Sequence, residues 1–506
     1  MSHMFYYCKT LTELSISGFN TNNVEDISYM FYYCTSISEL NLNIFNTQKV
    51  KNMSHLFDNC FSLKSLDISK FDTSNTIDLS GLFMDCQLLK NINISNLSTN
   101  KVKNMSHLFE NCNLLTSLDV SQLNTEKVID FSYMFKSCHS LNGLHLSTFD
   151  TKNAKDMSGM FQDCSNLSFI VINFDTSQVT DMSKMFQNCK TINTVDISSF
   201  NTEKVENMSK MFVGCKKINK LQFSHIKTNN VKNMSSLFRD CNQLKSIDLS
   251  NSETSLVEDM SYMFSECALL SNLTISNLKT YKVKDMSYMF RNCVSLTSLD
   301  ISNFDTSKVT KIIEMFQNVI KVKNLDCSNF NTKEVTDMYG MFYSMKSLEK
   351  LDISSFDTSK VTDMGSMFED ANNLEELNLN NFNTKNVVDM SYMFAFLTKL
   401  KNLNLENFNT SEVKNMSYMF SNCLSLTSLN ISNFKTENAE NMNHMFSLCE
   451  NLENLDVSNF NTNKVENMNS MFFNCKLLTS LDLLKFETKN VIDMSYMFSS
   501  CSNLKF

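Results

Sequence analysis

Cysteine is the residue type with the most chemical potential in this 506-residue sequence, because its 17 thiols could form disulfides, bind zinc or act as nucleophiles. Sixteen of them lie three residues after a recurring Phe. In four successive copies the same position holds Val319, Met345, Ala371 and Leu397 instead. A position that accepts these side chains is a core position, and no Cys-x-x-Cys pair occurs. We therefore expect a column of buried free thiols, with disulfides or zinc as the less favoured alternatives.

Stacked carboxylates are a second candidate site. Asp300, Asp326 and Asp352 occupy the same outward position in three successive copies, and parallel strands would place them about 4.8 Å apart. Like charges at this spacing repel one another, and a hard cation such as Ca²⁺, which prefers oxygen ligands, would relieve the repulsion. The interpretation that we favour is a solvated face, with Lys350 on the same strand. No bound metal or other cofactor is predicted.

The outward positions of the expected strands are polar except at one pair of neighbouring strands. Gly143 and His145 lie on one strand, and Phe169 and Val171 lie on the next, in a copy shortened to 25 residues. An exposed aromatic and aliphatic pair beside a small residue is typical of an anchor for a binding partner. The alternative is that the deletion shifts the register by one residue and turns Phe169 and Val171 into the core. The sequence leaves both interpretations open.

Histidine provides no catalytic or metal-binding constellation. His3, His55 and His107 share one column and lie two copies apart from one another, about 10 Å, which is too far to share one metal ion. His139 and His225 have no identifiable acid or nucleophile partner. Every reactive residue type recurs in a column, whereas catalysis needs one convergent cluster. We therefore predict that the protein is not an enzyme.

These columns exist because the whole chain is an array of one repeat. Its anchor is the Phe of a Met-Phe or Leu-Phe pair, which recurs every 26 residues from Phe5 to Phe498, except for 25 residues between Phe161 and Phe186. The copying accounts for a composition with 41 Phe, 34 Met, 7 Gly, no Pro and no Trp. It predicts one continuous solenoid over residues 1–506 without a separate second domain.

Each copy combines a helical pattern with a strand pattern. Apolar residues at i, i+3, i+4 and i+7 over residues 182–189 predict a helix of about two turns, with Asp181 as its N-cap. The alternation over residues 63–68 predicts a strand, and a Thr hydroxyl nearby can bond the local backbone or the next coil. The expected fold is an α/β repeat, a right-handed leucine-rich-repeat-like solenoid of about 20 coils with one parallel sheet face and short helices opposite. Its structural ladder in one coil comprises Phe57, Cys60, Leu66, Ile68, Phe71 and Thr73.

Two motifs carry a resemblance to a known family. Met-Phe-x-x-Cys with the following Ile and Leu, over residues 211–221, resembles the core of BspA-type leucine-rich repeats. The longer motif over residues 299–310, Leu-Asp-Ile-Ser-Asn-Phe-Asp-Thr-Ser-Lys-Val-Thr, is similar to the lipoprotein-associated BspA-like surface repeats of mycoplasmas, other bacteria and some protists. The resemblance implies a cell-surface array that binds other proteins or host matrix, and it supplies no catalytic residues. No targeting signal is recognised in the sequence, so the surface location is implied by the resemblance alone.

Charge and hydropathy narrow the choice of partners. A net charge of −9 argues against nucleic acid, and no apolar run approaches the roughly 20 residues of a membrane span, so direct membrane insertion is not expected. We predict a non-enzymatic cell-surface binding or adhesion scaffold that presents an extended polar strand face to protein or extracellular-matrix ligands. The alternative is a structural or assembly protein, a filament or particle component that is intracellular or virion-associated, which free thiols favour.

The ends of the array carry no recognisable polar caps. Met4 and Phe5 lie at one end, and Leu504 and Phe506 lie at the other. Terminal repeats of solenoids usually need a polar outer face. We expect the chain to be a domain of a longer protein, with self-association through the uncapped ends as the alternative.

Overall fold

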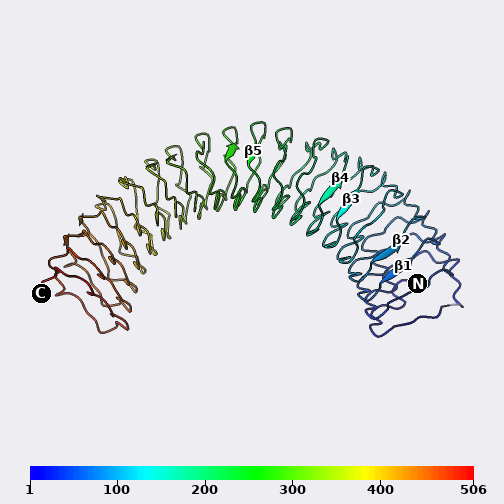
Figure 1. Ribbon diagram of the computed structural model, residues 1–506, viewed down its shortest axis with the longest axis horizontal. Coiled ribbons are helices and arrows are strands. Elements are labelled where there is room, and N and C mark those ends of the chain that lie inside the picture. The colour runs from blue at the N-terminus through cyan, green and yellow to red at the C-terminus, as the bar shows by residue number, and fades with distance from the viewer. Residues whose placement is uncertain (17, 506) are drawn as a thin grey trace. The chain divides into compact units, whose positions relative to one another are not determined.

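The computed structural model describes residues 1–16 and 18–505 and shows a parallel β-solenoid in which successive copies of the repeat stack as coils (Figure 1). The chain divides into two compact units, Met1–Thr254 and Ser255–Phe506, and each is described by itself. Phe506, which was expected to expose an apolar end, lies outside the described residues.

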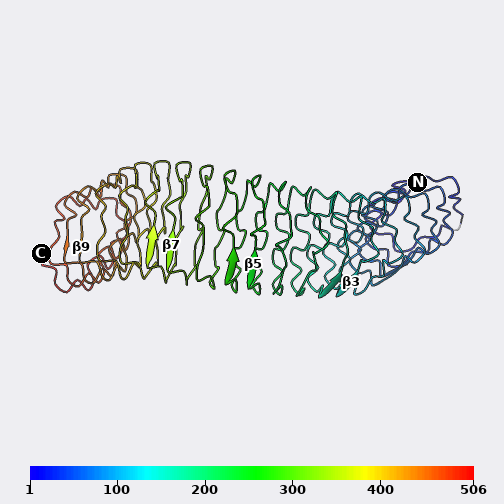
Figure 2. The ribbon, with the colours of Figure 1, turned by 90° about the horizontal axis from the view of Figure 1, so that it is seen from above.

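Short parallel strands form one side of the coils. In the first unit β1 pairs with β2 and β3 pairs with β4 (Figure 1). In the second unit β7 pairs with β8 and β9 with β10, and Figure 2 labels β7 and β9. Partners lie one repeat apart, as in Leu66 opposite Ile92. The strands of the first unit are β1 (Ser65–Asp67), β2 (Asn91–Asn93), β3 (Gly143–His145), β4 (Phe169–Val171) and β5 (Ser246–Asp248). Those of the second are β6 (Asn272–Thr274), β7 (Asn324–Asp326), β8 (Lys350–Asp352), β9 (Ser428–Leu429) and β10 (Asn454–Leu455).

A second ladder of parallel bridges follows the Asp or Asn column that was expected to cap helices. It runs from Asp26 to Asn233 in the first unit and from Asp259 to Asp493 in the second. The side chain usually accepts a hydrogen bond from the backbone two residues on, as Asp78 Oδ1 does from the Ser80 N–H at 2.8 Å. This Asx turn is the local bond that an N-cap makes, but here it fixes a bridge between coils.

The expected short helices are wrong, because the described residues contain no helix. Around the anchor Phe57, His55 and Asn59 have left-handed backbone, with φ of 53° and 61°. A left-handed residue every fourth position interrupts the right-handed conformation that a helix repeats. Backbone donors turn to the next coil instead. The His55 N–H bonds the Ser80 carbonyl at 2.8 Å, and the Phe57 N–H bonds the Leu82 carbonyl at 3.1 Å.

The helix expected after Asp181 fails for the same reason, since Lys184 and Asn188 have φ of 59° and 58°. The apolar spacing nevertheless marks the inner side, because Met182 and Phe186 are fully buried. The described part of the chain also contains no helix long and apolar enough to cross a lipid bilayer.

The number of complete coils is below the expected figure of about 20. Among the described residues the bridge ladder begins at Asp26, in the second copy of the repeat. Residues before it supply only part of a coil, from which the His3 N–H bonds the Ser28 carbonyl at 3.0 Å.

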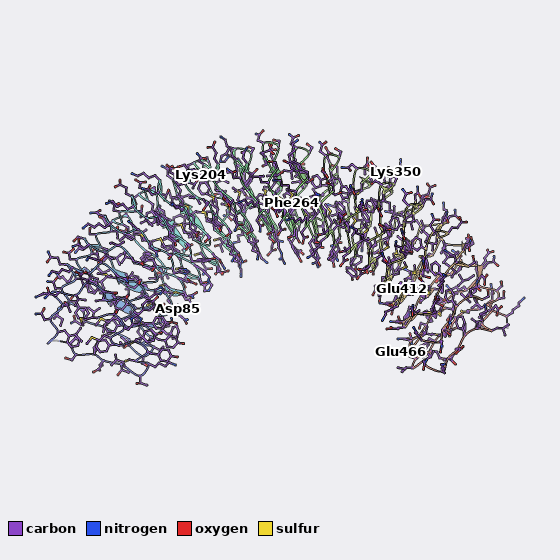
Figure 3. All side chains as sticks on the ribbon, turned by 180° about the vertical axis from the view of Figure 1, so that it is seen from behind. Asp85, Lys204, Phe264, Lys350, Glu412 and Glu466 are labelled. Atoms are coloured by element: carbon purple, nitrogen blue, oxygen red, sulfur yellow. The ribbon has the colours of Figure 1, made fainter. Side chains whose placement is uncertain are left out.

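The anchor phenylalanines stack through the centre of each unit. Ring centroids of successive anchors lie 5.4–6.1 Å apart between Phe5 and Phe238 and 5.6–5.9 Å apart between Phe264 and Phe498, with nearly parallel planes. Phe264 is fully buried inside its coil (Figure 3). All six residues of the expected structural ladder are buried: Phe57, Cys60, Leu66, Ile68, Phe71 and Thr73.

The Thr column links neighbouring coils through its hydroxyls. Thr332 Oγ1 donates to the Asp357 carbonyl at 2.9 Å and accepts the Asp357 N–H at 2.8 Å. Both backbone groups of Asp357, the N–H and the carbonyl, therefore have a partner. Thr73 differs, because its buried Oγ1 has no hydrogen-bond partner among the described residues.

These two threonines form a matched pair for measuring the inter-coil bond. Thr332→Val should lower the free energy of unfolding by about 1–3 kcal/mol, because it leaves the buried Asp357 N–H unsatisfied. Thr73→Val should leave it unchanged or raise it, because an unpaired hydroxyl is replaced by a methyl of similar size. Urea denaturation followed by circular dichroism measures both, and equal losses in the two variants would contradict the assigned role of the hydroxyl.

Candidate functional site

The strand face of the coils is polar almost throughout. In β1, Ser65 and Asp67 are exposed on either side of the buried Leu66, and the other strands repeat this alternation. Small hydroxyl, amide and carboxylate groups therefore line the shallow grooves along this face. Such a surface offers hydrogen bonds but little apolar area to a partner.

Phe169 and Val171 interrupt this polar face. Their side chains are 46% and 42% exposed, and the residue between them, Ile170, pairs with the buried Leu144 of β3. Gly143 lies opposite Phe169, and His145 lies opposite Val171. The structure therefore brings together the four residues of the candidate binding site on two adjacent strands.

The register shift that would have buried Phe169 does not occur, because the missing residue lies beyond the strand. Ile172, Asn173 and Phe174 follow β4 directly, whereas four residues, Ile68 to Phe71, span the same turn after β1. Pairing between β3 and β4 is thus unaffected by the deletion. Its local effect is that Ile172 is only half-buried, while Ile68 is buried.

Gly143 makes room for the Phe169 ring. A Cβ atom on Gly143 would lie only 2.0 Å from Phe169 Cζ, so the aromatic ring rests on the glycine backbone. The His145 ring meets its edge, with centroids 5.5 Å apart and planes at 61°. Any larger residue at position 143 would force the ring to move.

Backbone and side-chain hydrogen bonds hold the two strands beneath this pair. The Ser168 N–H bonds the Asn142 carbonyl at 2.8 Å, and Ser168 Oγ donates to Asn142 Oδ1 at 2.6 Å. At the other end, the Leu146 N–H bonds the Val171 carbonyl at 2.8 Å. The exposed ring is therefore carried by two hydrogen-bonded strands.

Carboxylates lie on both sides of the apolar pair. Asp119 lies two coils before the pair, with His145 between, and Asp196 lies in the coil that follows it; both are exposed. Hydrogen bonds from Ser121 and Ser198 respectively lower the pKa of these two carboxyl groups, so both carry a negative charge at neutral pH.

The stacked carboxylates are placed as expected but show no metal geometry. Asp326 and Asp352 lie opposite each other in β7 and β8, and Oδ1 of each accepts a backbone N–H, at 2.9 and 3.0 Å. Asp300 Oδ1 accepts one at 3.2 Å, and Lys350 is exposed on the same face (Figure 3). Within residues 1–16 and 18–505, His, Cys, Asp and Glu side chains form no group of three that could hold a metal ion.

The cysteine column has a role beyond packing that the sequence reasoning missed. All 17 cysteines are free, and the buried thiols donate to the preceding coil, as Cys60 Sγ does to the Phe31 carbonyl at 3.3 Å. Burial raises the pKa of these thiols, that of Cys164 to about 12. The sequence did contain a sign of this hydrogen bond: the position accepts Ala, as at Ala371, yet it usually holds Cys.

A second aromatic surface was also missed. On the turn side of the first coils Tyr29 stacks between His3 and His55, with ring centroids 5.0 and 4.7 Å away. His55 Nδ1 lies 2.8 Å from Oδ2 of Asp58, a carboxyl group whose pKa is raised by burial. The three rings therefore lie face to face along the stack of coils. The recurrence of Tyr and His two residues before the anchor Phe was the signal.

Comparison with known proteins finds one matching family. One family model, described as "Mycoplasma protein of unknown function, DUF285", matches residues 1–91, 77–170, 163–265, 232–347, 314–428 and 396–505. No curated protein matches the chain.

Several solved structures are similar in part. A leucine-rich repeat protein from Bacteroides ovatus is 16% identical, covers 90% of this chain and 87% of its own, and has a TM-score of 0.31. One from Eubacterium ventriosum is 14% identical, with 66% and 83% coverage and a TM-score of 0.35. A leucine-rich cell surface protein from Faecalibacterium prausnitzii is 17% identical, with 55% and 76% coverage and a TM-score of 0.28.

The outward position of Phe169 predicts a small effect on stability. Phe169→Ser should change the free energy of unfolding by less than about 1 kcal/mol, whereas Phe161→Ala, in the buried anchor column, should cost about 3–5 kcal/mol. Chemical denaturation of the two variants measures both. A loss of several kcal/mol in Phe169→Ser would mean that the ring belongs to the core.

The buried thiols predict selective alkylation. At pH 8 iodoacetamide should modify the exposed Cys8 of the folded protein first, because burial raises the pKa of the column thiols and keeps them protonated. After denaturation all 17 thiols should react. Mass spectrometry of tryptic peptides measures the sites, and rapid labelling of Cys164 in the folded protein would contradict the assignment.

Proposed function

The chain belongs to the family described as "Mycoplasma protein of unknown function, DUF285", and on that premise we propose that it is a non-enzymatic binding scaffold of the cell surface. It presents its strand face to a protein or extracellular-matrix ligand. One observation carries the proposal: among the residues of β1 to β10, Phe169 and Val171 are the large apolar side chains that are exposed.

The physical argument for binding is that Phe169 and Val171 provide exposed apolar surface, which the rest of the strand face lacks. Exposed aromatic and aliphatic side chains that a partner can desolvate provide most of the energy of typical protein interfaces. The surrounding hydroxyl, amide and carboxylate groups suit the polar rim of such an interface. A ring fixed against Gly143 loses little freedom when a partner covers it.

The remaining parts of the proposal rest on the sequence. The resemblance to BspA-like surface repeats supports the cell-surface location and the adhesive role. The recurrence of reactive residue types in columns, instead of in one convergent cluster, supports a non-enzymatic function.

A structural or assembly protein is the second candidate, because 17 free thiols suit a reducing compartment. That function, or self-association through the ends of the array, predicts particle sizes that grow with protein concentration in light scattering. A concentration-independent size would remove this candidate and leave the binding scaffold.

The binding scaffold is tested with purified matrix proteins. The full chain should bind at least one of immobilised fibronectin, laminin, collagen or fibrinogen, and Phe169→Ser with Val171→Ser should weaken that binding at least tenfold, because the anchor is lost. Surface plasmon resonance measures the affinities.

Val388→Ser is the matched control, because Val388 is also exposed but lies outside the strands. It should bind as the unchanged protein does. Binding that is insensitive to the Phe169 and Val171 changes would contradict the proposed site, and absence of binding to every matrix protein would contradict the proposed ligand class.

A further inference from the structure

The candidate binding site has a defined order of charges along the stack. Asp119, His145, Val171 and Asp196 occupy the same outward strand position in four successive coils, and His145 and Val171 pair directly. Phe169 lies in the neighbouring outward column of the same strand as Val171. A centre made of Phe169, Val171 and the His145 ring is thus flanked by one carboxylate on each side.

The two carboxylates are held in place and exposed. Asp119 Oδ1 accepts the Ser121 N–H at 3.0 Å, and Asp196 Oδ1 accepts the Ser198 N–H at 2.9 Å. These Asx turns fix the direction of the side chains at the rim of the apolar pair. Within the described residues neither carboxylate forms a salt bridge, and the nearby His225 contributes to lowering the pKa of Asp196. Their charges therefore face solvent.

The spacing of these groups matches an extended peptide. Three coil intervals of about 4.8 Å separate Asp119 from Asp196, which gives roughly 14 Å. Residues i and i+4 of an extended chain lie about 13 Å apart, and i, i+2 and i+4 project from the same side. One extended segment can therefore place a side chain over each carboxylate, and its side chain at i+2, about 7 Å from the first, falls between His145 and Val171, beside the Phe169 ring.

We propose that the site binds an extended peptide segment with basic side chains at positions i and i+4 and an apolar side chain at i+2. The segment crosses the strands, with its backbone along the stack of coils. The apolar side chain contacts Phe169 and Val171, and the basic side chains pair with Asp119 and Asp196. This inference rests on the proposed function, since it names the partner chemistry of the same site.

The charges exclude other ligand classes at this place. A nucleic acid or an anionic lipid headgroup would be repelled by both carboxylates, and the net charge of −9 adds to that repulsion. An entirely apolar segment would leave the two carboxylates without partners at the rim of the interface. Basic groups on both sides of an apolar residue satisfy both requirements.

The test uses a fluorescein-labelled peptide, Gly-Arg-Ser-Phe-Ser-Arg-Gly, and the full chain, with fluorescence anisotropy as the readout. Phe169→Ser should weaken binding at least tenfold, and Asp119→Asn and Asp196→Asn should each weaken it about threefold to tenfold. Raising the salt from 50 to 300 mM should weaken binding severalfold, because the rim charges are exposed.

Three controls define the specificity. Asp67→Asn changes the same outward position on β1, away from the site, and should bind the peptide as the unchanged protein does. Peptides with Glu in place of both Arg, or Ser in place of Phe, should lose at least tenfold in affinity. A peptide with the two Arg residues adjacent should bind more weakly than one with them four residues apart.

The outcomes separate this inference from the proposed function. Equal binding of the Arg and Glu peptides, or no effect of Asp119→Asn and Asp196→Asn, would overturn the basic-peptide inference. If binding to a matrix protein still depended on Phe169, the proposed function would stand even though the basic-peptide inference had failed. If neither the peptide nor any matrix protein depended on Phe169, both would fail.

Discussion

Hydrogen bonds between successive coils are the interaction on which the rest of the structure depends. On the turn side of a coil, alternate backbone N–H groups bond carbonyls of the next coil, as the His55 and Phe57 N–H groups do. The residues between them bond their own coil three positions back, as the Leu56 N–H does to the Met53 carbonyl at 3.3 Å. A single coil cannot satisfy its own backbone, so a coil is stable only in a stack.

This bonding scheme explains the restricted composition. Because nearly every backbone donor on the turn side has a partner, a proline there would remove a bond between or within coils. The left-handed positions before and after the anchor Phe do not select glycine: Gly81 and Gly214 occupy two of them, but Tyr29, Lys184 and Leu448 adopt the same positive φ, which the bonds between coils impose. Equivalent positions in neighbouring coils contact one another, so Phe stacks on Phe, and each buried Cys donates to the carbonyl of the anchor Phe in the preceding coil.

Much of this architecture was predictable from the period alone. The 26-residue spacing identified the stacked coils, and the recurring Phe, Cys and strand Leu are buried as a repeated core requires. The helix was mispredicted because an i, i+3, i+4 spacing describes which side chains point inward and not the backbone that carries them. Asn59 and Asn188, which directly precede a Cys, were the sign of a left-handed backbone.

The candidate site was only half predictable, for a related reason. The sequence identified Phe169 and Val171 as departures from a polar column, but their direction depended on where in its copy the missing residue lay. The turn between Ile172 and Phe174 absorbs the deletion, because a turn can shorten without changing strand pairing, whereas a strand cannot lose a residue without exchanging its faces.

The fold does not require an exposed ring on this face, and such a ring carries a risk of aggregation. Apolar residues exposed on a strand promote unwanted association, and the equivalent positions in β1, β5 and β7 hold Ser, Asp and Asn. The neighbouring copy supplies Gly143, which has no side chain and therefore leaves space for the ring. A glycine here adds no packing to the core. Two independent departures from the repeat, in adjacent coils, therefore fit each other at one place. In an array copied so closely, this fit between Gly143 and the Phe169 ring sets the strand pair apart from the polar outward positions of β1, β5 and β7.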